Sequence, residues 1–230
     1  SMGTGLPFRS AADAIALVGL LAIARVFMSL AAMDIGTAFG TLGARRDMMI
    51  GFLAEPALLM VIFVASLISA TTALPLIAER LVVQPLALYP SLAFTAVAFT
   101  MVLLAENARI PVDNPATHLE LTMIHEAMLL EYSARHLALM EWAAALKLFN
   151  YACIGFALFV PWGTSIGETG IGALALSLPA LLAKLVVAGL WLALLETVSA
   201  KLRVFRAPEF LATAFMFAVL GLLVHLLLGA

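Results

Sequence analysis

The segment between residues 106 and 142 concentrates the side chains of this chain that could exchange protons. It holds six of the 14 acidic residues and three of the four histidines. They are Glu106, Asp113, Glu120, Glu126, Glu131 and Glu141, with His118, His125 and His136. Carboxylates and imidazoles are groups whose pKa values a protein can move toward neutral pH. The segment therefore predicts proton exchange or docking of a partner, and the alternative is a solvated loop whose charges serve solubility.

Metal chemistry is a weaker interpretation of the same residues. His118 and His125 lie seven positions apart, close to one helix face, but two histidines with scattered carboxylates fall short of a metal-ligand pattern. Cys153 is the single cysteine, so neither an iron–sulfur cluster nor an internal disulfide can be built. We expect no metal, no cofactor and no catalytic residue in this chain, and we expect any redox centre to be in a partner.

The composition around this segment is that of a polytopic membrane protein. Hydrophobic residues make up 64% of the 230 residues, charged residues 11%, and the mean hydropathy is +1.12. Six apolar runs are long enough, or nearly so, to cross about 30 Å of hydrocarbon. They cover approximately residues 14–32, 52–74, 89–104, 137–161, 171–199 and 210–228. Because lipid cannot satisfy backbone polar groups, we expect a single integral membrane domain over residues 1–230, an all-α transmembrane bundle with six spans.

The basic residues predict how this bundle is oriented. The loops after the first, third and fifth spans hold seven of them, whereas the other side holds only Arg9 and Arg80. The seven are Arg45, Arg46, Arg109, Arg135, Lys201, Arg203 and Arg206. The positive-inside rule then places the carboxylate-rich segment 106–136 in the cytoplasm and the C-terminus on the opposite side of the inner (cytoplasmic) membrane.

A helix is expected inside the cytoplasmic segment. Asn114 followed by Pro115 is typical of an N-cap and a first helical position, and Thr117-x-x-Glu120 adds an offset capping-box pattern. A helix over about residues 115–130 could pack an apolar stripe on the membrane domain while presenting titratable groups. The stripe would comprise Leu119, Met123, Ala127 and Leu130.

Six ionisable residues fall inside the predicted spans: Arg25, Glu55, Glu141, Lys147, Lys184 and Glu196. Each costs about 2.5–3.5 kcal/mol at the bilayer centre on insertion scales. We therefore expect these residues to face one another, near bends that Pro56 and Pro179 would produce. The alternative for each is a structural ion pair or a side chain that reaches the membrane surface.

The order of these residues resembles a known family. The pattern is Glu106-Asn-x-Arg109-x-Pro111-x-Asp113, then Glu131-Tyr-Ser, then Ala138-Leu-x-Glu141, with Gly43-Ala-Arg-Arg-Asp-Met-Met, Ala54-Glu-Pro56 and Lys184 around it. It is similar to the membrane subunit that anchors the peripheral arm of respiratory complex I and of energy-converting hydrogenases. The run after Asp113, Asn-Pro-Ala-Thr-His-Leu-Glu, is closer to the formate hydrogenlyase and hydrogenase-4-like branch. Complex I members instead carry an acidic run there and tend to have arginine where Glu196 stands.

The resemblance implies a non-catalytic subunit that links cytoplasmic redox chemistry to ion translocation in a formate hydrogenlyase-like complex. Its partners would be hydrogenase large and small subunits, an iron–sulfur subunit and antiporter-like membrane subunits, with the [NiFe] centre and iron–sulfur clusters in those partners. We expect the proton path to involve Glu55, Glu106, Asp113, Glu120, Glu126, Glu131, Glu141, Lys147, Lys184, Glu196, His118 and His125. We expect the peripheral arm to dock near Arg45, Arg46, Arg109 and Arg135.

Two other functions stay open at this stage. One is the quinone-chamber membrane subunit of a complex I-like NADH:quinone oxidoreductase, in which a quinone would bind beside segment 106–136. The other is a stand-alone cation or proton transporter, although the internal repeats typical of such proteins are not found in the sequence. The family usually has eight spans, and the chain begins Ser1-Met2, so we expect an amino-terminal part to be missing. The surrounding lipid bilayer is an expected partner and nucleic acid is not.

Overall fold

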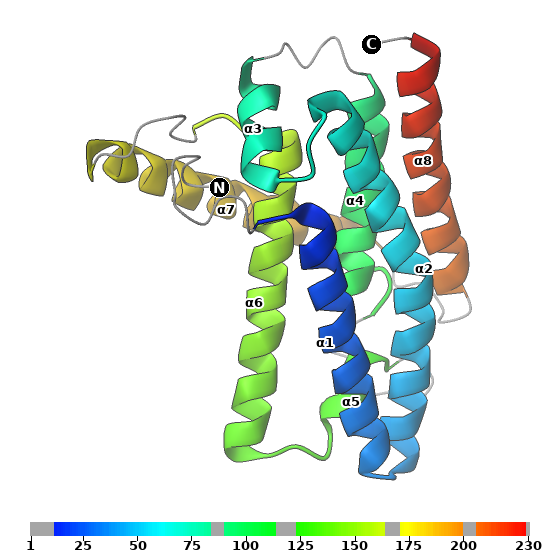
Figure 1. Ribbon diagram of the computed structural model, residues 1–230. Helices are drawn as coiled ribbons and strands as arrows, with labels where there is room; N and C mark the ends of the chain where they lie inside the picture. The colour runs from blue at the N-terminus through cyan, green and yellow to red at the C-terminus, as the bar shows by residue number, and fades with distance from the viewer. Residues whose placement is uncertain (1–11, 84–89, 114–122, 164–170, 200–205, 229–230) are drawn as a thin grey trace.

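The computed structural model describes residues 12–83, 90–113, 123–163, 171–199 and 206–228 (Figure 1). The secondary structure of these residues is helical, apart from an isolated bridge between Asp13 and Ala73. The helices are α1 (Ala14–Asp34), α2 (Ala38–Ser69), α3 (Leu74–Val83), α4 (Ser91–Glu106), α5 (His125–Leu129), α6 (Ala134–Phe159), α7 (Ile171–Val198) and α8 (Ala207–Leu228). Five of them are long and apolar enough to cross a membrane, namely α1, α2, α6, α7 and α8, and α4 is a shorter apolar helix. The predicted all-α polytopic architecture is confirmed.

Helix α2 is the centre of the bundle. It contacts α1, α3, α4, α5 and α8, and α4 packs closely on α8. Small residues make these approaches possible: Ala54 and Ala57 on α2 are fully buried, and a Cβ atom added at Gly221 would lie 2.7 Å from Cγ2 of Thr95. This close packing of small residues is typical of helices inside membranes, where backbone approach and dispersion replace the hydrophobic effect.

The beginning of α1 is joined to the connection between α2 and α3. The carboxylate of Asp13 caps α1 by accepting hydrogen bonds from the backbone N–H groups of Ile15 and Ala16, at 2.9 and 3.0 Å. It also accepts the hydroxyl proton of Thr72, and the N–H of Ala14 donates to the carbonyl of Thr72 at 2.9 Å. This exposed end of α1 is therefore fixed beside the end of α2.

Helix α2 begins earlier than the sequence predicted. The expected span started near residue 52, but the helix starts at Ala38, where Thr37 adopts an extended backbone and its hydroxyl accepts the N–H of Gly40 at 3.3 Å. Its 32 residues correspond to a length of about 48 Å, which is more than the thickness of the hydrocarbon. The polar first turns of α2 can therefore extend beyond the hydrocarbon while they stay helical. Arg45 and Arg46, expected in a loop, consequently lie on α2.

Helices α4 and α7 also depart from a simple row of parallel spans. Helix α4 has 16 residues and ends at Glu106, which is buried. Helix α7 runs across α6 and α4 rather than alongside them (Figure 1). Most of its large described side chains are exposed, among them Val186, Val187 and Leu190.

The helix predicted over residues 115–130 is only partly within the described chain, because residues 114–122 lie outside it. The described part is helical only at His125–Leu129. Two members of the predicted apolar stripe, Met123 and Ala127, are buried as expected, whereas Leu130 is 52% exposed. The apolar contact with the membrane domain is therefore shorter than predicted at its C-terminal end.

Gly43 makes room for α5 against α2, and this contact can be tested by substitution. A Cβ atom at Gly43 would lie 2.8 Å from the carbonyl oxygen of Ile124 and 2.9 Å from Cβ of Ala127. We expect Gly43→Ala to destabilise the folded protein by about 1–3 kcal/mol, as overpacking usually does. The measurement is thermal unfolding of the purified protein in detergent. Gly19→Ala on α1 is the matched control, because nothing lies within 4 Å of the added Cβ; an equal loss of stability in both variants would contradict the role of this contact.

Candidate functional site

A buried group of charges lies where α1, α2, α4 and α6 converge. Arg25 on α1 is 8% exposed, and its Nη2 pairs with Oε2 of Glu106. Its Nη1 lies 3.6 Å from Oε1 of Glu55, and its Nε lies 3.8 Å from Oδ2 of Asp47. Lys147 on α6 completes the group, with Nζ 3.1 Å from Oε2 of Glu106. We call Arg25, Asp47, Glu55, Glu106 and Lys147 the charge cluster.

The sequence of α2 explains why the guanidinium fits. Asp47, Gly51 and Glu55 are spaced by four residues, so they follow one another along one face of the helix. A Cβ atom at Gly51 would overlap the guanidinium of Arg25 and lie 2.8 Å from its Cδ. Glycine therefore leaves the space that Arg25 occupies, and a carboxylate one turn away on each side balances its charge.

Lys147 performs two tasks at the end of α4. Besides its ion pair with the Glu106 carboxylate, its ammonium donates a hydrogen bond to the Glu106 carbonyl at 2.6 Å. The last carbonyls of a helix have no partner within the helix and form the negative end of its dipole. A cation at this position thus stabilises both the helix end and the carboxylate beside it.

The charge cluster is unbalanced. When all five groups are ionised, three carboxylates face two cations, which gives a formal charge of −1. Oε1 of Glu106 is buried and accepts no hydrogen bond from the described residues. Burial disfavours net charge, so this arrangement carries an electrostatic cost.

The segment after α4 covers the cluster. Asp113, 2% exposed, accepts the backbone N–H of His125 at 3.0 Å. Nη1 of Arg46 donates to the carbonyl of Met123 at 2.9 Å, which fixes the same segment to α2. The imidazole of His125 has a buried Nε2 with no hydrogen-bond partner among the described residues. Burial lowers the pKa of His125, and the positive charges of Lys147 and Arg25 act in the same direction, against the carboxylates of Asp47 and Asp113.

The structure brings together only part of the predicted proton path. Glu55, Glu106 and Lys147 are in the charge cluster, and Asp113 and His125 lie against it. Four other described candidates do not join it: Glu131 and Glu141 are exposed, Lys184 lies near the end of α6, and Glu196 pairs with Arg109 at 3.6 Å. Glu126 is on α5, next to His125. His118 and Glu120 lie outside the described residues.

The expectation that all six ionisable residues in spans face one another is therefore wrong for Glu141, Lys184 and Glu196. The reason is the course of α7, which passes across the bundle, and the exposed first turns of α6. Among the predicted docking arginines, Arg45 and Arg135 are exposed, while Arg46 and Arg109 bind within the chain. Their roles stay predictions.

Asp47 is the functional candidate that sequence reasoning missed. It was assigned to a loop together with Arg45 and Arg46, so its helical phase relative to Glu55 was not considered. The signal that could have found it is the spacing of eight residues, with a glycine halfway, on a continuous helix. No group of three or more histidine, cysteine or acidic side chains that could hold a metal ion occurs among the described residues.

The helical architecture and the charge cluster define a multi-pass membrane protein with ionisable groups buried between its helices. Residues 3–227 match the sequence model of the family described as NADH dehydrogenase, and the chain belongs to this family. It is 32% identical over 217 residues to formate hydrogenlyase subunit 4 of Escherichia coli (strain K12), across 94% of this chain and 69% of that protein. It is 33% identical over 181 residues to hydrogenase-4 component C of the same strain. That alignment covers 79% of this chain and 54%, about half, of the relative.

These comparisons confirm the resemblance deduced from the pattern around Glu106, Asp113 and Glu131. The two relatives are parts of hydrogenase-type complexes by their names, and the family as a whole is named for NADH dehydrogenase.

Removal of Arg25 is expected to destabilise the protein strongly. Arg25→Gln would remove the ion pairs of Asp47 and Glu55 and leave Glu106 paired with Lys147, and loss of one partner from a buried ionic network typically costs about 3–5 kcal/mol. The measurement is the free energy of unfolding, from denaturant titration in detergent micelles. Arg109→Gln is the control, because its pair with Glu196 is about one-third exposed and worth less than about 1 kcal/mol. Similar losses in both variants would show that the cluster does not fix the bundle.

The lowered pKa of His125 predicts that acid destabilises residues 123–129, which cover the charge cluster. The unfolded segment binds a proton near the ordinary pKa of 6.5, whereas the folded segment binds one only at lower pH. The neutral imidazole therefore contributes fully to the stability of the folded segment above pH 6.5. This stability is lost as the pH falls from 6.5 toward the pKa of His125 in the folded state. The protection factors of the amides of residues 123–129, which compare the measured exchange rates with the intrinsic rates at the same pH, should fall on acidification below pH 6.5, and less so in His125→Asn. His136→Asn, at an exposed position on α6, is the control and should show the same pH dependence as the unaltered protein. If His125→Asn also shows an unchanged pH dependence, the group that titrates is not His125.

Proposed function

We propose that this chain is the membrane-anchoring and proton-path subunit of an energy-converting hydrogenase similar to formate hydrogenlyase. The observation that carries the proposal is the charge cluster, with its formal charge of −1 and with Oε1 of Glu106 free of hydrogen bonds among the described residues. It lies against the segment that holds Asp113 and His125. The names of the two Escherichia coli relatives supply the kind of complex.

The arrangement gives a physical route for coupling. A change of charge or position in segment 106–136 acts first on Asp113 and His125, which lie against the cluster. The charges of Asp47, Lys147 and Arg25 act on His125 in turn, so proton binding at the imidazole and in the cluster is energetically linked. A redox event in a partner that moves this segment would therefore change the protonation of the cluster.

The proposal includes the topology and the partners. Residues 1–230 form one membrane domain in the inner membrane, with segment 106–136 in the cytoplasm and the C-terminus on the other side, as the basic residues indicate. The hydrogenase large and small subunits and an iron–sulfur subunit dock on the cytoplasmic face, near Arg45 and Arg135, and bring the [NiFe] centre and the clusters. Antiporter-like membrane subunits lie beside it.

A quinone-reducing complex is the second candidate, because the family that the chain matches is described as NADH dehydrogenase. In that case the segment above the cluster would line a quinone chamber. Purification through a tag on this chain, with assays of hydrogen evolution and quinone reduction, separates the two. Recovery of a nickel-containing partner supports the first candidate, and a quinone-reducing assembly without one supports the second.

The proton path is tested by neutral variants of the cluster. In the assembled complex, reconstituted in liposomes, we expect Glu106→Gln to lower severalfold the number of ions moved per electron, because the carboxylate with the unpaired oxygen no longer exchanges a proton. Glu55→Gln, at a more exposed member of the cluster, gives a second test if Glu106→Gln prevents assembly.

Glu79→Gln on α3 is the control, since Glu79 belongs to no ion pair of the cluster, and it should pump normally. Co-purification of the same partners shows that each variant assembles. Assembled variants of Glu106 and Glu55 that pump as many ions per electron as the unaltered complex would remove the cluster from the path. Glu141→Gln, measured in the same assay, tests whether the path continues along the exposed face of α6.

A further inference from the structure

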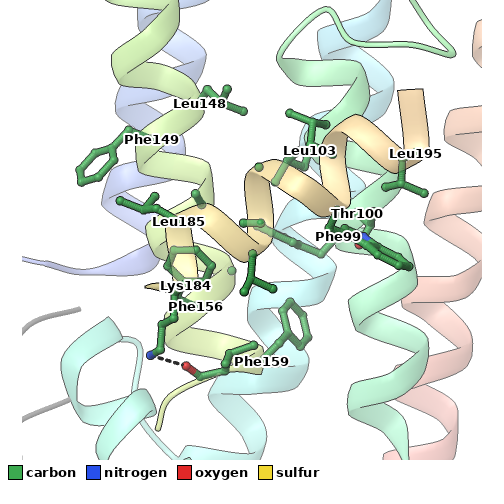
Figure 2. A pocket seen from close by; sticks show the side chains of 18 of the residues that line it. Phe99, Thr100, Leu103, Leu148, Phe149, Phe156, Phe159, Lys184, Leu185 and Leu195 are labelled. Carbon is green, nitrogen blue, oxygen red and sulfur yellow. Dashed lines mark hydrogen bonds between the residues drawn. The ribbon is translucent and has the colours of Figure 1, made fainter. Parts of the chain in front are cut away.

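A large cavity lies apart from the charge cluster, between α4, α6 and α7 (Figure 2). Its volume is about 750 Å³, which is within the range of sites that bind small molecules. The lining is almost entirely aliphatic and aromatic, and Phe99, Leu148, Phe156, Phe159, Leu185 and Leu195 project into it (Figure 2). This cavity separates α7 from the rest of the bundle, and α7 has few other neighbours.

Two charged residues line the cavity, and their situations differ. Arg109 pairs with Glu196 at 3.6 Å. The ammonium of Lys184 donates one hydrogen bond, to the carbonyl of Val160 at 2.7 Å, and lies 5.9 Å from the centre of the Phe156 ring (Figure 2). No carboxylate of the described residues pairs with Lys184. An ammonium has three donors, so two are left for another acceptor.

The position of Lys184 corresponds to the surface of a membrane. Val160 directly follows the last residue of α6, a helix long and apolar enough to span the bilayer. Trp162, two residues further, is 49% exposed, and tryptophan is enriched where hydrocarbon meets the lipid headgroups. From Val160 to Ala145 the cavity follows α6 for about 22 Å of helix rise, into the depth of the bilayer. The site thus offers a cation at its mouth and an apolar channel behind it.

We propose that this cavity binds an anionic glycerophospholipid such as phosphatidylglycerol. One acyl chain lies between α4, α6 and α7, and the phosphate accepts hydrogen bonds from Lys184. The lipid supplies the contact between α7 and the bundle that protein side chains supply only sparsely. Charge complementarity selects this occupant, because a lipid phosphate offers the acceptor that no carboxylate of the described residues provides to Lys184.

Lipid retention tests the site independently of ion pumping. The complex, purified through a tag on this chain, is exchanged into micelles that contain equal amounts of phosphatidylglycerol and phosphatidylcholine, and native mass spectrometry counts the lipids that stay bound. We expect preferential retention of phosphatidylglycerol, and about fivefold weaker retention in Lys184→Gln, from the loss of one basic residue at the membrane surface. Lys184→Arg should retain it, and Ala188→Trp should weaken it by narrowing the cavity while Lys184 is intact.

Arg80→Gln is the matched control. Arg80, like Lys184, donates to a carbonyl at the end of a span, that of Ser69, but it lines no part of this cavity. Its variant should bind lipid as the unaltered complex does. Equal retention of both lipids, or retention that Lys184→Gln and Ala188→Trp leave unchanged, would overturn the proposal. Recovery of a quinone in place of phosphatidylglycerol would assign the cavity to the quinone. A cross-link from Ala188→Cys to a partner helix would assign the cavity to that helix. Either result would also overturn the proposal.

Discussion

The guanidinium of Arg25 is the constraint on which the rest of the bundle depends. A charge at this depth is tolerated only with partners, and the partners come from three other helices: Asp47 and Glu55 on α2, Glu106 on α4 and, through Glu106, Lys147 on α6. Gly51 leaves space for the guanidinium between α1 and α2. Because α4 is short, its last residue, Glu106, lies beside the guanidinium and not at the membrane surface. The ion pairs around one side chain thus connect four helices.

The cover over this cluster is held by different means. Three features fix residues 123–129: the hydrogen bond from His125 to Asp113, the bond from Arg46 to the Met123 carbonyl, and the close approach at Gly43. The segment also has apolar contacts, because Ile124 belongs to the main core and Met128 packs with Ala32 and Ala44. A helix of five residues has fewer such contacts than the long helices, so this segment opens at lower free-energy cost than the bundle. The element that faces the cytoplasm in the proposed topology is consequently the one that can respond to a partner.

The sequence predicted the class of fold well, because hydropathy and length determine which segments lipid can accept. It also placed Arg25, Glu55 and Lys147 inside spans, whereas it placed Glu106 in the cytoplasmic segment. It could not predict their partners. Asp47 looked like a loop residue, since hydropathy marks the end of the apolar run and not the end of the helix, which Thr37 determines. Glu141, Lys184 and Glu196 carried the same hydropathy signal as the cluster residues, and only the tertiary course of α6 and α7 separates them. Residues 114–122, with His118 and Glu120, lie outside the described structure, so that part of the predicted site stays a prediction.

The composition of the cluster argues for function over stability. A buried ionic network of this kind is often no more stable than well-packed aliphatic residues of similar volume, while the loss of one member is costly. Four helices could converge here with leucine and alanine, as α2, α4 and α8 do elsewhere. Two cations could also balance two carboxylates, but a third carboxylate is present, and one oxygen of Glu106 has no hydrogen bond among the described residues. Packing explains neither the surplus charge nor the unpaired oxygen. Both agree with the proposed function, in which the cluster takes up and releases one proton.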